Sequence, residues 1–162
     1  MITKSFLRLA AVVLALVSLP AGAVVNVFAT VPEWAALARE IGGDKVNVFA
    51  ATSALQDPHR IEARPSLIAR ARSSQLVVAT GADLEIGWLP VVLRESGNAA
   101  IQPGRPGYFE AAPQVRMLEV PARLDRADGD VHAGGHPHIQ THPRKIQKVA
   151  EALAGPLSPV GG

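Results

Sequence analysis

The chain has 162 residues, with 16 Lys and Arg against 14 Asp and Glu, and it contains no Cys. This length supports one domain with a buried core, and the lack of Cys excludes disulfides and leaves His and carboxylates as metal ligands. The even charge balance and the lack of a Lys/Arg-rich run argue against nucleic acid as a partner.

Residues 1–23 have the pattern of a secretory signal peptide. Lys4 and Arg8 precede an apolar stretch that runs to Val17, and Ala21-Gly22-Ala23 offers small residues for cleavage. The apolar core is well short of the roughly 20 residues that cross a bilayer as a helix. The alternatives are an N-terminal anchor or a buried helix, but we expect cleavage after Ala23, export to the periplasm and no lipidation. Cleavage would leave 14 basic and 14 acidic residues.

Strands and helices alternate along the next part of the chain. Segments rich in β-branched and apolar residues predict three strands, at 24–29, 45–51 and 75–80. Two prolines at helix starts and one inside an apolar segment predict helices at 32–41, 65–72 and 86–95, the last interrupted by Pro90. Residues 99–102 are a candidate fourth strand. This order favours an α/β fold, an open four-stranded parallel sheet flanked by helices.

The second part of the chain is less regular. Prolines and glycines punctuate residues 103–128, within which 116–120 is predicted as a short edge strand. A last helix begins at Pro143, with Ile146, Val149 and Leu153 on one buried face, and Gly155-Pro156 is expected to end it. The predicted organisation is a signal peptide at 1–23, one lobe at 24–154 and an irregular tail at 155–162.

The chain's five histidines all fall in predicted loops. His59 follows the second strand, whereas the other four lie within eleven residues: His132, His136, His138 and His142. Loops at the carboxyl ends of parallel strands form the ligand crevice of such folds, and neutral imidazole is a good ligand for Zn²⁺ and Mn²⁺. Alternatives are a loop or N-cap role for His59 and plain surface composition for the rest, but the clustering favours a metal site.

Several motifs resemble those of the periplasmic solute-binding proteins of zinc and manganese ABC importers. Asp57-Pro58-His59 resembles the family's Asp-Pro-His ligand loop, and Gly81 to Glu85 with Trp88-Leu89 resembles its Gly-x-x-x-Glu motif and following Trp-Leu. Gly135-His136-Pro137-His138, followed by His142-Pro143, resembles its second motif, Gly-Asn-Pro-His with a following Asp-Pro. The resemblance extends over residues 25–154.

This resemblance implies a fold and a function. The fold would be a single lobe of a two-lobe metal receptor, in which His59 and His138 are the ligands from this lobe and His132 and His136 flank them. The transported ligand would be Zn²⁺ or Mn²⁺, the partner would be a membrane permease of an ABC importer, and no bond would be made or broken, so the protein would not be an enzyme.

The sequence departs from the family pattern in three ways. His136 replaces the Asn and His142 replaces the Asp of the second motif, so either side chain could be an extra ligand. The family's second lobe does not follow residue 154. The tail that begins at Gly155 also cuts short the family's long helix, and both features suggest a truncated or frameshifted receptor. A nonfunctional remnant is one alternative. A zinc-dependent hydrolase is another, although the sequence has no His-Glu-x-x-His or Gly-x-Ser-x-Gly motif.

Overall fold

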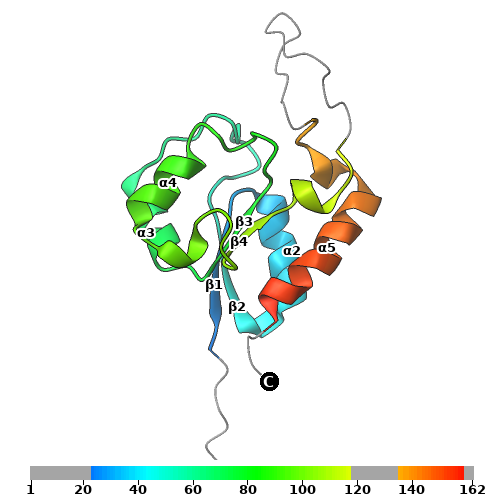
Figure 1. Ribbon diagram of the computed structural model, residues 1–162, viewed down its shortest axis with the longest axis horizontal. Helices are drawn as coiled ribbons and strands as arrows, with labels where there is room; N and C mark the ends of the chain where they lie inside the picture. Colours follow the sequence, from blue (N-terminus) through cyan, green and yellow to red (C-terminus); the bar gives the residue numbers. More distant parts are fainter. Residues whose placement is uncertain (1–22, 118–134, 159–162) are drawn as a thin grey trace, which may run out of the picture.

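A computed structural model describes residues 23–117 and 135–158. Four strands form one sheet in the order β2-β1-β3-β4, and every neighbouring pair is parallel (Figure 1). The strands are β1 (Val25–Ala29), β2 (Val46–Ala50), β3 (Leu76–Ala79) and β4 (Tyr108–Glu110). The predicted α/β fold with an open four-stranded parallel sheet is therefore confirmed.

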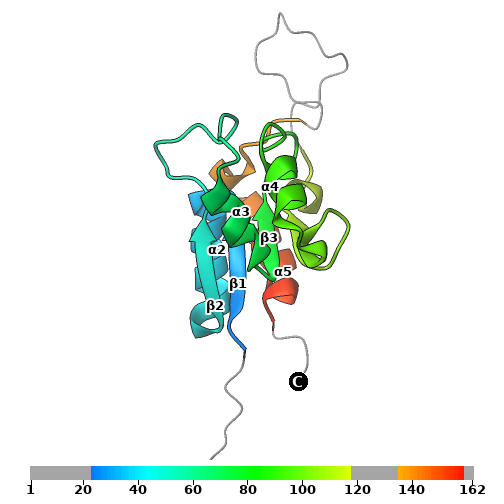
Figure 2. The ribbon, with the colours of Figure 1, turned by 90° about the vertical axis from the view of Figure 1, so that its left-hand side faces the viewer.

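Within the described ranges, four α-helices cover the two faces of the sheet. They are α2 (Pro32–Gly42), α3 (Pro65–Arg72), α4 (Leu89–Ser96) and α5 (Pro143–Leu157). Helices α2 and α5 lie on one face, and α3 and α4 lie on the other (Figures 1 and 2). Each has a proline in its first turn, where the missing N–H would have no partner within the helix and the fixed φ favours helix entry.

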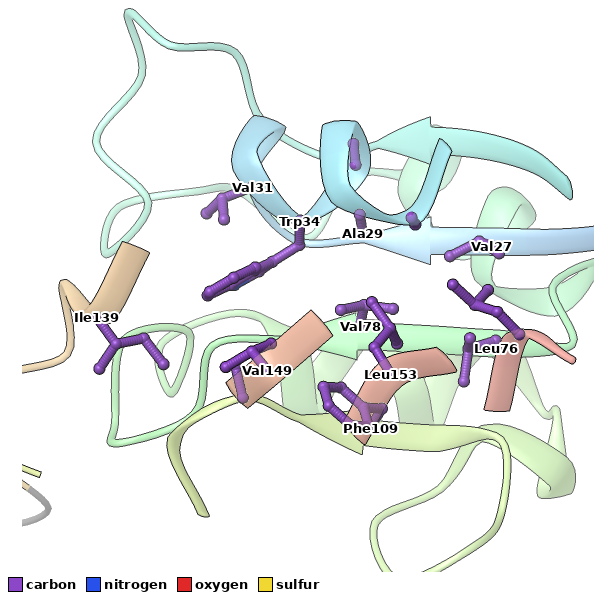
Figure 3. Close-up of a cluster of buried hydrophobic side chains, with 14 of the residues drawn as sticks. Val27, Ala29, Val31, Trp34, Leu76, Val78, Phe109, Ile139, Val149 and Leu153 are labelled. Atoms are coloured by element: carbon purple, nitrogen blue, oxygen red, sulfur yellow. The ribbon is translucent and has the colours of Figure 1, made fainter. Parts of the chain in front are cut away.

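The strands divide their side chains between two hydrophobic clusters. In β1, Val27 and Ala29 pack with α2 and α5, whereas Phe28 packs with α3 and α4. Figure 3 shows the α2–α5 cluster, where Val27, Val78 and Leu153 lie between the sheet and the helices. All four residues of β3 are buried because both of its faces are covered, which explains why this strand is continuously apolar.

The prediction of a fourth strand at 99–102 is wrong. Residues Ala99–Ile101 form a 3₁₀ turn, η2, whose first residues are capped by Asn98: its side-chain oxygen accepts from the N–H of Ala100. The Asn98 amide also donates to the carbonyl of Ser74, at 2.7 Å, which holds this turn against the start of β3. The chain then reaches the sheet edge at Gly107, where a Cβ would lie 2.6 Å from the Gln75 carbonyl. Only glycine fits there, and β4 follows it.

Two helix boundaries also differ from the predictions. Helix α4 begins at Leu89, so Pro90 lies in its first turn and does not interrupt it. Helix α5 continues past Gly155 and Pro156, so the prediction that this pair ends it is wrong, and residues 155–157, expected in the irregular tail, are helical. Leu157 is 3% exposed in the α2–α5 cluster, and this burial favours the extra turn.

Some predictions lie outside the described residues. These are the signal peptide, apart from Ala23, most of the edge strand expected at 116–120, His132, and residues 159–162 of the expected tail. Within the described ranges, no helix is both long enough and apolar enough to span a bilayer.

Candidate metal site

The loop that carries His59 is anchored at the carboxyl edge of the sheet. It connects β2 to α3, and its first residue continues the sheet, since the N–H of Ala51 donates to the Ala29 carbonyl at 2.8 Å. Further along, the indole Nε1 of Trp88 donates to the Pro58 carbonyl at 2.8 Å. A Cβ on Gly87 would lie 3.2 Å from the His59 carbonyl oxygen, so the chain before α4 packs closely against this loop. The position of His59 is therefore fixed from a segment about 30 residues away.

The His59 ring is oriented by Asp57. The Asp57 Oδ1 lies 2.8 Å from the ring Nδ1 and 3.0 Å from the His59 backbone nitrogen, which donates to it. Both hydrogen bonds from His59 hold the pKa of Asp57 below its usual value, and the bond from the backbone N–H has the larger effect of the two. A carboxylate only accepts, so in the neutral ring Nδ1 carries the proton and Nε2 carries the lone pair. That is the tautomer needed to bind a metal ion through Nε2, and such a carboxylate partner is common beside ligating histidines.

A buried carboxylate stabilises the same edge of the sheet. Glu85 is 3% exposed, and its oxygens accept from the Thr30 hydroxyl at 2.6 Å and from the backbone N–H groups of Thr80 and Gly81 at 2.8 and 3.1 Å. The network links the ends of β1 and β3 to the turn that leads to α4. The sequence signal for Glu85 was its place in the Gly-x-x-x-Glu motif, but this network was not predicted.

His138 is held by the core beneath it. The next residue, Ile139, begins the 3₁₀ turn η5 (Ile139–Thr141) and is 1% exposed in the α2–α5 cluster. Figure 3 shows its side chain in the cluster with Trp34 and Val149. Thr141, the last residue of η5, donates its hydroxyl to the His138 carbonyl at 2.9 Å. This bond and the buried side chain of Ile139 together restrict the backbone at His138.

The two predicted ligands are close together. The ring centroids of His59 and His138 are 6.0 Å apart, at an interplanar angle of 72°. Two imidazoles on one tetrahedral Zn²⁺, with Zn–N bonds of about 2.0–2.1 Å, have centroids roughly 5 Å apart. A small side-chain movement would therefore let the two rings share an ion.

The other histidines are placed differently. The His136 ring lies 5.3 Å from that of His138, and its Nδ1 accepts from the His138 backbone N–H at 3.2 Å. While this bond is kept, the neutral His136 ring carries its proton on Nε2, so neither nitrogen has a lone pair for an ion. His142 is the exposed N-cap residue of α5, and the described part of the chain shows no contact between its ring and the other rings.

The residues that the structure describes contain no group of three or more His, Cys, Asp or Glu placed to hold a metal ion. What they offer is a pair of imidazoles. Two imidazoles from separate segments, one with its tautomer set by a carboxylate, are half of a four-ligand zinc site.

A pocket of about 550 Å³ opens beside this edge of the sheet, but no histidine lines it. Its polar groups include Glu110, whose Oε1 accepts from the Tyr108 hydroxyl at 3.0 Å. Burial, followed by the nearby Glu110 charge, raises the pKa of Tyr108 well above its usual range, so the hydroxyl stays protonated. Since the pocket has no nitrogen or sulfur ligand for a transition metal, the histidine pair is the better candidate site.

Residues 27–160 match the model of the family described as "ZnuA: Zinc-uptake complex component A periplasmic". The chain belongs to this family. Members are metal-binding solute receptors of ABC importers rather than enzymes, as the sequence motifs indicated. A curated relative is the manganese ABC transporter substrate-binding lipoprotein scaA of Streptococcus gordonii, 26% identical over 108 residues, which are 67% of this chain and 34% of the relative.

Solved structures of the family have the same fold. A crystal structure of ZnuA aligns with a TM-score of 0.66 at 23% identity, over 83% of this chain and 48% of that one. Zn(II)-bound AdcA from Streptococcus pneumoniae aligns with a TM-score of 0.63 at 19% identity, over 83% and 26%. The chain thus spans about a third of the curated relative and less than half of these structures.

Proposed function

We propose that this chain binds zinc outside the cytoplasm and delivers it to the permease of an ABC importer, with manganese as the alternative ion. His59 and His138 are the ligands that this lobe contributes, and residues 1–23 direct export and are removed. The protein has no catalytic step, since the cargo is bound and released unchanged.

The observation that carries this proposal is the contact between the two imidazoles. His59 comes from the loop after β2 and His138 from the turn before α5, yet their ring centroids lie 6.0 Å apart. Since these positions are 79 residues apart in the sequence, only the fold can bring them together. Membership of the family supports a metal ion as the cargo.

The choice of zinc over manganese rests on ligand chemistry. Imidazole nitrogen suits zinc, whereas manganese favours carboxylate, carbonyl and water oxygens. The relatives include both a manganese transporter component and a Zn(II)-bound structure, so competition between the two ions is a necessary part of the test.

Isothermal titration of residues 24–162 with Zn²⁺ tests the proposal. With two protein ligands and water in the remaining positions, we expect binding far weaker than at a closed four-ligand site. His59→Ala and His138→Ala should each weaken binding by roughly tenfold or more, because a single imidazole is left. His142→Ala removes an exposed imidazole that contacts neither ring and should cause a smaller loss. If neither of the first two substitutions changed the affinity, the assignment would be wrong.

A further inference from the structure

Gln140 lies two residues after His138, in η5, and is half-buried. Its Nε2 is 3.5 Å from the His138 Nδ1, while its Oε1 is buried and has no hydrogen-bond partner among the described residues. A buried acceptor without a partner costs free energy, so one such atom beside a functional side chain needs an explanation.

The two ends of the Gln140 amide have opposite effects on His138. When Nε2 faces the ring, it donates to a lone pair on Nδ1, so the proton of the neutral ring is on Nε2. When the amide is turned by 180°, Oε1 accepts from an Nδ1–H, and Nε2 of the ring carries the lone pair. Side-chain amide nitrogen and oxygen have nearly the same shape, so both orientations fit the same space.

We propose that Gln140 is the positioning residue of His138 and selects its metal-binding tautomer by turning Oε1 toward Nδ1. The inference rests on the proposed function, because an ion bound through Nε2 requires that nitrogen to be unprotonated. Asp57 likewise sets the tautomer of His59, but a carboxylate only accepts, so it holds the His59 ring in a single tautomer. The amide of Gln140 serves either tautomer. His138 thus changes tautomer when the ion arrives, whereas His59 is already prepared.

The tautomer of His138 can be measured without any metal. Long-range ¹H–¹⁵N NMR of the histidine rings, at about pH 8 where an imidazole with an ordinary pKa is neutral, reports which nitrogen carries the proton. We compare residues 24–162 with Gln140→Glu, which can only accept, and Gln140→Met, which has a similar length and no hydrogen bond. The Glu variant should move the His138 proton to Nδ1. The Met variant, which offers neither a donor nor an acceptor, should leave the proton on Nε2.

Zinc titration of the same variants gives the second measurement. Gln140→Glu should tighten binding and Gln140→Met should weaken it, each by about tenfold, as for other partners of ligating histidines. Gln147→Glu is the charge control, because Gln147 is exposed on α5 and this substitution adds the same negative charge away from the His138 ring. It should leave the His138 tautomer unchanged and alter the affinity less than Gln140→Glu does.

An unchanged His138 tautomer in Gln140→Glu would overturn the inference, and so would an unchanged zinc affinity in Gln140→Met when the unsubstituted chain binds zinc. If the tautomer responds but no variant binds zinc, the proposed function fails while the role of Gln140 in orienting the ring is supported. Gln140→Glu tests the inference through the tautomer and Gln140→Met tests it through the affinity, so the loss of one variant to misfolding leaves the other test intact.

Discussion

The Asp57–His59 pair and the Gln140–His138 pair show how single residues prepare this site. Asp57 is an exposed carboxylate two residues before its histidine, and the short Asp-Pro-His loop places its Oδ1 against both the ring and the backbone nitrogen. The spacing was visible in the sequence, and the hydrogen bonds were not. Gln140 was not singled out at all, because a glutamine in a loop gives no signal until the ring beside it is located.

At the residue scale, we expect Asp57→Ala to weaken zinc binding by about tenfold or more. The substitution removes the acceptor that keeps the proton of the His59 ring on Nδ1, and losing such a partner typically costs this much affinity. Asp57→Asn keeps one oxygen that can accept, so its loss should be smaller. Isothermal titration measures both variants.

The control for this series is Asp44→Ala. Asp44 is exposed in η1 (Gly43–Lys45), which precedes β2 and so lies at the opposite end of that strand from the His59 loop. Its removal changes the net charge as Asp57→Ala does. Equal affinities for Asp57→Ala and Asp44→Ala would mean that the carboxylate acts only through its charge.

At the scale of elements, the sequence predicted most helices and strands but misplaced the fourth strand. Proline at the starts of α2, α3 and α5 and β-branched residues in three strands are local signals, and these segments were found within a few residues. Strand β4 has only three residues and follows a segment rich in proline and glycine. It is a strand because its backbone pairs with β3, and no local pattern reports that pairing.

Tyr108 allows β4 to be tested by pH. Burial raises its pKa in the folded state, whereas the unfolded chain releases the phenol proton near pH 10. Below about pH 10 the phenol is protonated in both states, and its contribution to the free energy of unfolding is fully present. Above about pH 10 the unfolded state loses the proton and the folded state keeps it, so the free energy of unfolding falls as pH rises. Tyr108→Phe should show a shallower fall between about pH 9 and pH 11, measured from urea midpoints.

The chain has a single Tyr, so the phenolate absorbance of the unfolded and folded protein reports this group alone. Lysines also titrate in this range, but they are the same in both proteins and cancel in the comparison. Parallel stability curves for the two proteins would show that Tyr108 ionises equally in the folded and unfolded states.

At the scale of the whole molecule, the two faces of the sheet have different tasks. On the α3–α4 face, Trp88 and the chain just before α4 hold the His59 loop. On the α2–α5 face, Ile139 holds His138. The site therefore forms where the two clusters meet the carboxyl edge. Loosening either cluster should disturb one histidine and leave the other in place.

Helix α5 provides the test at this scale. Leu153 is completely buried against α2 and the sheet, and Leu153→Ala should lower the free energy of unfolding by about 2–5 kcal/mol through the cavity it creates. Gln147→Ala changes an exposed position of the same helix and should alter stability by about 0.5 kcal/mol or less. Urea unfolding measures both variants, and equal effects would contradict the packing of α5 described above.

The sequence by itself determined the alternation of strands and helices, the parallel α/β class and the candidate histidines, because these depend on local periodicity, proline placement and short motifs. Only the tertiary structure decided that His59 and His138 meet, that the His136 ring accepts a hydrogen bond from the His138 backbone, and that Gln140 lies beside the His138 ring. The reason is physical: a hydrogen bond or a shared ion depends on distances of a few ångströms, and for residues far apart in the chain these are set by packing of the core between them.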